Sequence, residues 1–346
     1  MRKLLLCLLL IIFLPSSVFA SVVVMDADTN RVLYGSDENE VRLIASTSKI
    51  MTAMVVLNNA DISKTITINQ NVLKSYGSGI YVEIGEEITI EDLLYGLMLR
   101  SGNDAAIALA DEVGGSNNGF IMLMNELSSS LGMKNTNFIN ASGLENENGE
   151  GNMSSAKDMA ILMSYAMKNE QFRTITGTKH HMVKTNYKTY DWYNKNKLLS
   201  TYEYTTGGKT GYTKKAYRTL VTSATKDNKN LVVVTLNQKD DFALHQSLYE
   251  EYFKKYKLVN IIDSKTFLKD DDMYVEEDFS MLLTDTEIDD VKVEIVKTND
   301  AIDRMGYVTV SLNDHDYFRE NIYLQEEEKE LSFFQKVKLF FANLFS

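Results

Sequence analysis

Ser46 and Lys49 are the residues of this chain best suited to chemistry, because they stand three positions apart where an apolar stretch begins. That stretch, 50–57, reads Ile-Met-Thr-Ala-Met-Val-Val-Leu and predicts a buried helix. Residues three apart on a helix share one face, so the spacing brings a hydroxyl next to an amine. A serine becomes a nucleophile when a neighbouring base takes its proton, and a lysine can serve only if its pKa falls well below ~10.4.

The pattern Ser-x-x-Lys is common, and the chain contains it again at 154–157 and 223–226. Taken alone, each copy is more typical of a helix cap with a solvated lysine than of a nucleophile with its base. The copy at 154–157 begins a predicted helix with Ser154 or Ser155 as its cap, which explains its lysine without catalysis. The copy at 46–49 differs from the other two in the motifs that follow it.

Two polar motifs follow Ser46 along the chain. The first, Ser101-Gly102-Asn103, separates two apolar segments of helical spacing, 91–99 and 104–110. Such a short break forces polar side chains into an interior, where they need hydrogen-bond partners. The second motif, Lys209-Thr210-Gly211, opens a predicted strand in which the glycine permits close approach of another backbone.

These motifs need a scaffold of strands and helices to bring them together. The expected strands are 22–26, 31–34, 218–224 and 231–236, and the turns between them are rich in Asp and Asn. Strands joined in pairs by such short turns predict an antiparallel sheet, with 218–224 and 231–236 as a hairpin. The fold class we expect is therefore α/β (α+β), an antiparallel sheet flanked by helices.

The three motifs, in the order Ser46-x-x-Lys49, Ser101-x-Asn103 and Lys209-Thr210-Gly211, resemble those of penicillin-recognising serine enzymes. More narrowly, the chain resembles the D-alanyl-D-alanine carboxypeptidases, which are low-molecular-mass penicillin-binding proteins, over roughly 21–260. The resemblance implies a transpeptidase-like or β-lactamase-like catalytic domain. The chain departs from the family in lacking a proline near Ala45 and in carrying Asn152-Met153 where relatives often have His-Tyr.

The resemblance implies a catalytic role for three side chains. Ser46 attacks the carbonyl between two terminal D-alanines, and Lys49, held neutral, accepts the serine proton. Ser101 relays a proton toward the leaving amine. Water then hydrolyses the acyl-enzyme, and a β-lactam acylates Ser46 by the same attack.

The resemblance also implies the residues that bind the stem peptide of peptidoglycan ending in D-Ala-D-Ala. Asn103 hydrogen-bonds the substrate amide, and Lys209 with Thr210 holds the terminal carboxylate. Gly211 lets the peptide lie as an added strand. The backbone N–H groups of Ser46 and Tyr212 form the oxyanion hole.

Three alternatives to a carboxypeptidase remain at this point. A degenerate relative would bind peptides or β-lactams without turnover, although all motif residues are present. A class A β-lactamase would carry a loop glutamate within Glu-x-x-[Leu/Ile]-Asn, and no such pattern occurs between Asp104 and Gly208. An endopeptidase that cuts cross-links would use the same residues.

The N-terminus has the features of a secretory signal. Arg2 and Lys3 precede an apolar run, and Val18-Phe19-Ala20 suits cleavage after residue 20. The single cysteine, Cys7, lies inside this segment, so the mature chain is expected to be exported without disulfides. The four histidines show no metal-ligand spacing, and we expect neither a metal nor a cofactor.

The end of the chain differs in composition from the domain at 21–260. Segment 261–326 contains short alternating strands with acidic turns and predicts a small β domain. From Asp263 to Glu330 there are 7 basic and 21 acidic residues, which argues against a nucleic-acid partner. Segment 327–346 predicts an amphipathic helix whose Phe-rich face, within 331–345, anchors the protein peripherally on the outer face of the cytoplasmic membrane. The alternative is docking on the protein itself.

Overall fold

The computed structural model describes residues 20–268, 273–298 and 304–324. The chain divides into two compact units between Lys257 and Leu258. Apart from Ala20, the predicted signal peptide lies outside the described residues, and so does the whole amphipathic helix predicted for 327–346. In the described ranges, no helix combines the length and apolar character needed to cross a bilayer.

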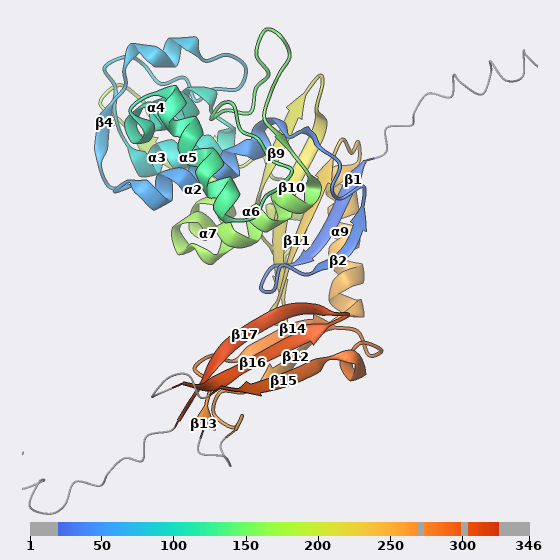
Figure 1. Ribbon diagram of the computed structural model, residues 1–346. Coiled ribbons are helices and arrows are strands. Elements are labelled where there is room, and N and C mark those ends of the chain that lie inside the picture. Colours follow the sequence, from blue (N-terminus) through green and yellow to red (C-terminus); the bar gives the residue numbers. More distant parts are fainter. Residues whose placement is uncertain (1–19, 269–272, 299–303, 325–346) are drawn as a thin grey trace, which may run out of the picture. The chain divides into compact units, whose positions relative to one another are not determined.

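The first unit is built on a five-stranded antiparallel sheet in the order β2-β1-β11-β10-β9 (Figure 1). Its strands are β1 (Ser21–Asp26), β2 (Val32–Ser36), β9 (Thr205–Thr213), β10 (Tyr217–Lys226) and β11 (Lys229–Leu236). The predicted hairpin is confirmed as β10 and β11. Its turn has φ of 52° at Asp227 and 59° at Asn228, a geometry that matches the twist of paired strands.

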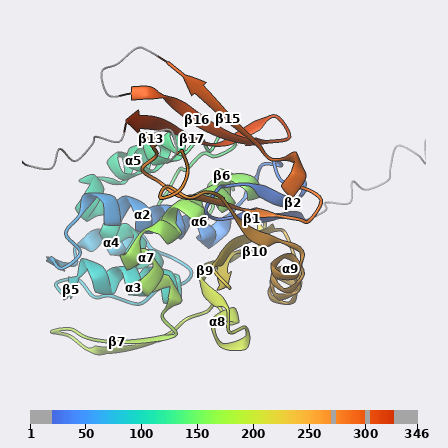
Figure 2. The same ribbon diagram turned by 90° about the horizontal axis from the view of Figure 1, so that it is seen from below.

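Helices cover both faces of this sheet (Figure 2). Successive side chains on a strand point to opposite faces. Thr222 of β10 therefore meets α9 (Asp241–Lys255), while its neighbour Val221 joins the apolar core that contains α6 (Ala156–Lys168). The sheet is thus buried between two helical layers, which explains the continuous apolar run 231–234 in β11.

The helix that follows Ser46 lies at the centre of the helical layer. α2 (Lys49–Asn59) is buried at every residue from Lys49 to Val56, because other helices pack around it. These neighbours are α3 (Ile90–Arg100), α4 (Asn103–Gly114), α5 (Asn117–Ser130), α6 and α7 (Glu170–Gly177).

The start of the predicted helix differs from expectation. Residues Ala45–Ser48 form a 3₁₀ turn, η1, and the α-helix begins at Lys49. The side chains of Thr47 and Ser48 donate hydrogen bonds to the carbonyls of Ile44 and Ala45, which tightens the turn. Since side chains at i and i+3 eclipse in a 3₁₀ turn, this change brings Ser46 and Lys49 closer to alignment.

Short elements complete the first unit. They are the pairs β3 (Arg42–Leu43) with β6 (Met153–Ser154), β4 (Thr65–Thr67) with β5 (Glu87–Thr89), and β7 (His180–Lys184) with β8 (Thr189–Tyr193), together with η2 (Gln70–Lys74) and α8 (Leu198–Thr201). Segment 75–86 between η2 and β5 has no helix or strand.

The second unit is all-β. Four strands form a sheet in the order β13-β17-β16-β15, and β12 pairs with β14. The strands are β12 (Lys257–Ile262), β13 (Met273–Tyr274), β14 (Phe279–Leu283), β15 (Lys292–Lys297), β16 (Arg304–Leu312) and β17 (His315–Leu324), with a short 3₁₀ turn, η4 (Ile288–Asp290). Its core includes Met281, Leu283, Val308 and Val310. The predicted antiparallel sheet with flanking helices and the small β domain after it are both confirmed.

Candidate active site

Ser46 is held in η1 by contacts from two other segments of the chain, β10 and the loop that contains Gly143. Ala45, at the start of η1, adopts a left-handed φ of 47°, which is uncommon for a residue other than glycine. Thr219 of β10 donates a hydrogen bond to the Ile44 carbonyl (3.1 Å). A Cβ at Gly143 would lie 2.0 Å from the Ala45 carbonyl oxygen, so only glycine fits at that position. The backbone that carries the nucleophile is therefore fixed from several sides.

Lys49 is fully buried and has three oxygen partners. Its Nζ lies 3.2 Å from Ser46 Oγ, 2.7 Å from Asn103 Oδ1 and 2.5 Å from the Ser142 carbonyl oxygen. The Asn103 and Ser142 oxygens accept hydrogen bonds when they face an amine. A neutral lysine has two N–H groups and one lone pair, so these two oxygens take both N–H groups. The lone pair is left facing the Ser46 hydroxyl, as a base requires.

Burial lowers the pKa of Lys49 from 10.5 to about 7. The positive charge of Lys195 lowers the pKa further, while the Asp104 carboxylate acts in the opposite direction. A lysine with this pKa is neutral in a large fraction of molecules near neutral pH, and catalytic lysines are tuned to the same range.

Ser101 and Asn103 lie in the break between α3 and α4, where both are buried as expected. Ser101 ends α3 in the left-handed conformation (φ 64°), and Asn103 is the first residue of α4. Asn103 Nδ2 donates to the Tyr76 carbonyl (2.6 Å). Because a carbonyl oxygen only accepts, this bond fixes the Asn103 amide with Oδ1 toward Lys49.

Lys209 approaches the same place from β9. Its Nζ lies 3.1 Å from Ser101 Oγ and 2.7 Å from the Thr210 carbonyl, and the residue is 1% exposed. Burial, together with the charges of Lys49 and Lys195, holds the pKa of Lys209 well below its usual value. Among the described residues, no carboxylate forms an ion pair with Lys209. An anionic group entering the cleft would provide a counter-charge, so anion binding favours protonation of this lysine.

A cleft of about 380 Å³ opens beside these groups. Its lining includes Ser46, Ser101, Thr210, Gly211 and Tyr212, so the structure brings the predicted residues of all three motifs together. β9 forms one wall and is the edge strand of the sheet, so an extended ligand could add along its outer side. Some β9 backbone groups already have side-chain partners, since Gly208 bonds Thr176 and the Thr210 carbonyl accepts from Lys209.

Gly211 is packed too tightly for a side chain. A Cβ at this position would lie 2.3 Å from Thr219 Oγ1 and 3.0 Å from the Ser46 backbone nitrogen. The side chain of Tyr212 is 63% exposed, which leaves its backbone as the part placed at the cleft. Gly211 therefore lets β9 approach the nucleophile's own backbone.

The other two Ser-x-x-Lys copies have structural roles. Ser155 is the N-cap of α6, because its side chain accepts a hydrogen bond from Asp158 N. Ser223 lies in the middle of β10 and exchanges a hydrogen bond with Thr206. On a strand, residues 223 and 226 point to opposite faces, so that pair does not meet.

Several site residues were not predicted from the sequence. The Ser142 carbonyl is a backbone group, and no side-chain pattern identifies it. Lys195 lines the cleft, is exposed to solvent, and acts electrostatically on both buried lysines. Arg218 also lines the cleft, paired with Asp241 at the start of α9. The sequence feature that could have pointed to Lys195 is the polar stretch Asn194-Lys195-Asn196, which precedes Lys209.

The antiparallel sheet between helical layers, with Ser46 and Lys49 at the start of a buried central helix, defines the fold of the penicillin-binding D,D-peptidases. A crystal structure of a D-alanyl-D-alanine carboxypeptidase from Mycobacterium tuberculosis H37Rv is similar, with a TM-score of 0.64 and 30% identity. The match covers 68% of this chain and 90% of that chain.

The family model described as D-alanyl-D-alanine carboxypeptidase, Peptidase_S11, matches residues 15–240, so the chain belongs to this family. Over 220 residues it is 37% identical to the D-alanyl-D-alanine carboxypeptidase DacF of Bacillus subtilis, a match over 62% of this chain and 56% of that protein. It is 36% identical to the D-alanyl-D-alanine carboxypeptidase of Streptomyces sp. (strain K15) over 61% of this chain and 78% of the relative. The chain thus spans little more than half the length of DacF.

Proposed function

We propose that this protein is a serine-type D-Ala-D-Ala carboxypeptidase that removes the terminal D-alanine from peptidoglycan stem peptides. The observation that carries this proposal is the geometry of Lys49, whose two hydrogen-bond acceptors leave its lone pair facing Ser46. Family membership supports the choice of substrate class.

The proposed reaction has two steps. Ser46 Oγ attacks the carbonyl carbon between the two D-alanines while its proton passes to Lys49 Nζ. The oxyanion is held by the backbone N–H groups of Ser46 and Tyr212, where loss of one donor typically costs ~10²–10³ in rate. The carbon–nitrogen bond then breaks, and the proton held by Lys49 is relayed through Ser101 to the leaving amine, which returns Lys49 to its neutral form. Water hydrolyses the resulting ester and restores the serine.

The anionic end of the substrate explains the second buried lysine. Lys209 and Thr210 would bind the terminal carboxylate, and the Lys209 contact with Ser101 Oγ places that charge next to the proton relay. The peptide would pair with the exposed edge of β9, and the Asn103 side chain would hydrogen-bond its amide. A β-lactam carries a carboxylate and a reactive carbonyl, so it would occupy the same groups and acylate Ser46.

A class A-like β-lactamase needs a glutamate that activates the deacylating water. Within the described residues, the hydrogen bonds of Lys49 go to Ser46, Asn103 and Ser142, and the Glu145 carboxylate accepts one from Thr213. This arrangement favours slow deacylation. A catalytically weak peptide-binding or penicillin-binding protein and an endopeptidase are the other outcomes of the test below.

The proposed location follows from the two ends of the sequence. A signal at 1–20 would export the protein, and the amphipathic segment within 327–346 would attach it to the outer face of the cytoplasmic membrane. Binding of the full chain and of a chain ending at residue 326 to anionic vesicles tests the attachment. Equal binding by the two forms contradicts it.

The activity is tested by the intact mass of the exported domain after addition of benzylpenicillin, and by release of D-alanine from a peptide ending in D-Ala-D-Ala. We expect a lasting one-to-one adduct on Ser46 and D-alanine release, with both lost in Ser46→Ala and in Lys49→Met. Lys157→Met, from the capping copy of the motif, is the matched control and should retain both. A short-lived adduct with rapid drug loss indicates a β-lactamase. An adduct without D-alanine release indicates a binding protein, and cleavage of cross-linked muropeptides alone indicates an endopeptidase.

A further inference from the structure

Segment 76–82, the irregular part of the chain after η2, holds Asn103 in place. The Tyr76 carbonyl accepts from Asn103 Nδ2 (2.6 Å), and the Ser78 carbonyl accepts from Asn103 N (2.8 Å). Ser78 Oγ also accepts a hydrogen bond from Lys195 Nζ (3.3 Å). The orientation of the Asn103 amide therefore depends on where this irregular segment lies.

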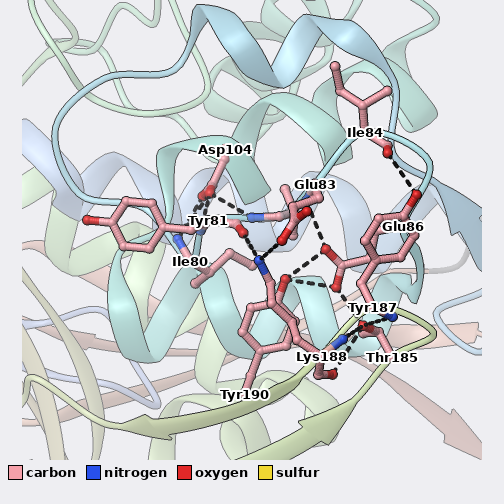
Figure 3. A network of polar contacts seen from close by, with 11 residues as sticks. Ile80, Tyr81, Glu83, Ile84, Glu86, Asp104, Thr185, Tyr187, Lys188 and Tyr190 are labelled. Atoms are coloured by element: carbon pink, nitrogen blue, oxygen red, sulfur yellow. Dashed lines mark hydrogen bonds and ion pairs between the residues drawn. The ribbon is translucent and has the colours of Figure 1, made fainter.

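The Asp104 carboxylate fixes the segment from the side of α4. Its oxygens accept backbone N–H groups of Ile80 (3.0 and 3.1 Å), Tyr81 (2.5 Å) and Val82 (3.3 Å), as Figure 3 shows for the first two residues. Asp104 is only 4% exposed. Burying a carboxylate is costly unless donors surround it. Here three of the donors belong to one segment of irregular backbone, and the fourth is the backbone N–H of Ala105 in α4 (2.9 Å).

The hairpin of β7 and β8 holds the adjoining residues of the same stretch (Figure 3). Lys188 Nζ donates to the Tyr81 carbonyl (2.5 Å) and to Glu83 Oε1 (2.8 Å). Tyr190 Oη donates to the fully buried Glu86 carboxylate (2.8 and 2.9 Å), and Thr185 donates to it as well (2.7 Å). Segment 76–82 and its continuation to residue 86 are thus anchored on two sides.

We propose that Asp104 is a positioning residue for the reaction: by holding segment 76–82 it fixes the Asn103 amide, and through it the Lys49 lone pair. An asparagine amide can rotate by half a turn at little cost when its surroundings permit. If the Tyr76 carbonyl moves away, the hydrogen bond that fixes Asn103 Nδ2 is lost and the amide can turn. With Nδ2 turned toward Lys49, a neutral amine would lose one acceptor, and its lone pair would no longer be held on Ser46.

Asp104 also has an electrostatic effect that the test can separate from positioning. The groups that act on Lys49 are Lys195 and Asp104, and Lys209 stands across the cleft from β9. The negative charge of Asp104 raises the pKa of Lys49. Asp104→Asn removes that charge, so the acid limb of the pH–rate profile should move to lower pH.

The experiment rests on the proposed function and measures acylation by benzylpenicillin, resolved into the dissociation constant of the first complex and the acylation rate constant. We expect Asp104→Asn to lower the rate constant roughly 10²-fold. The dissociation constant should change less than about threefold. Asp111→Asn is the matched control, because Asp111 lies on the same helix and, in the hydrogen bonds of the described residues, bonds only the side chains of Asn69 and Asn71 near η2. It should leave both constants unchanged.

Tyr190→Phe tests positioning without changing a charge, since it removes one hydroxyl from the Glu86 anchor. We expect a smaller loss, about three- to tenfold in the rate constant, with the acid limb unmoved. This variant also decides the matter if Asp104→Asn does not fold. Full acylation rates in a folded Asp104→Asn, or in Tyr190→Phe when Asp104→Asn is unfolded, would overturn the proposal. A wild-type protein that forms no adduct would refute the proposed function instead, and the Asn103 side-chain amide signals in NMR would then report whether Asp104→Asn frees that group.

Discussion

The pH dependence of acylation should reveal the neutral lysine directly. With a pKa of about 7, Lys49 is uncharged in about one tenth of molecules at pH 6, about half at pH 7 and about nine tenths at pH 8. Relative to the ordinary value of 10.5, the environment disfavours the charged form by roughly 5 kcal/mol. The acylation rate should therefore rise about tenfold per pH unit below pH 6 and level off above pH 8.

Removal of the nearby cation should shift this profile in a defined direction. After burial, the charge of Lys195 contributes most to lowering the pKa of Lys49, so Lys195→Gln should move the acid limb to higher pH. The variant should then lose more activity at pH 6.5 than at pH 9. Lys197→Gln is the matched control, because Lys197 lines the same cleft and is not among the groups that act on Lys49.

The assay is stopped-flow or quenched acylation by benzylpenicillin between pH 5 and pH 10, with the adduct followed by intact mass. The position of the limb is compared between proteins, since the height of the plateau also reflects substrate binding. A wild-type limb above pH 9 would show that Lys49 is charged near neutrality and is not the base. If the acid limb of Lys195→Gln lies at the same pH as that of the wild type, Lys195 does not lower the pKa of Lys49 and the electrostatic argument is refuted.

Two further predictions concern a close backbone contact at Gly211 and the buried side chain of His245. Gly211→Ala places a Cβ 2.3 Å from Thr219 Oγ1 and 3.0 Å from the Ser46 nitrogen, so acylation should fall at least about 10²-fold. Gly132→Ala, whose Cβ would meet nothing within 4 Å, should lose some stability because Gly132 has φ of 72°, but the folded variant should acylate normally. Equal rates in the two variants would contradict the argument. His245 is fully buried between Thr222 and Thr235, and burial lowers its pKa to about 3. Because the unfolded state binds this proton at higher pH, the folded state should lose about 2 kcal/mol between pH 8 and pH 5 in urea unfolding, a loss that His245→Gln should lack.

The sequence predicted those parts of the site that side-chain chemistry marks. Ser46, Lys49 and Lys209 could be recognised because each sits in a short pattern with a fitting neighbourhood. The hairpin of β10 and β11 could be recognised from its two apolar runs and the Asp-Asn turn between them. The polar break at 101–103 implied buried partners, and the structure supplies them.

The remaining parts could not be predicted because backbone groups or distant segments provide them. The Ser142 carbonyl completes the environment of Lys49, and any residue type could carry that oxygen. The 3₁₀ turn at Ser46 depends on local hydrogen bonds that compete with an α-helix over four residues. The hydrogen bonds from segment 76–82 to Asp104 could not be predicted either, because this segment has no periodic pattern that would place it beside α4.

Gly211 and Tyr212 are neighbours on β9 with opposite freedom to mutate. A side chain at 211 would collide with the nucleophile's turn, whereas the Tyr212 ring faces solvent and only its backbone has a proposed role. If a drug gained its affinity from the Tyr212 ring, a single substitution at that position would give resistance with little loss of enzyme function. A drug that paired with the backbone of β9 would instead bind groups that every residue except proline carries, and resistance there would have to change the shape of the strand itself.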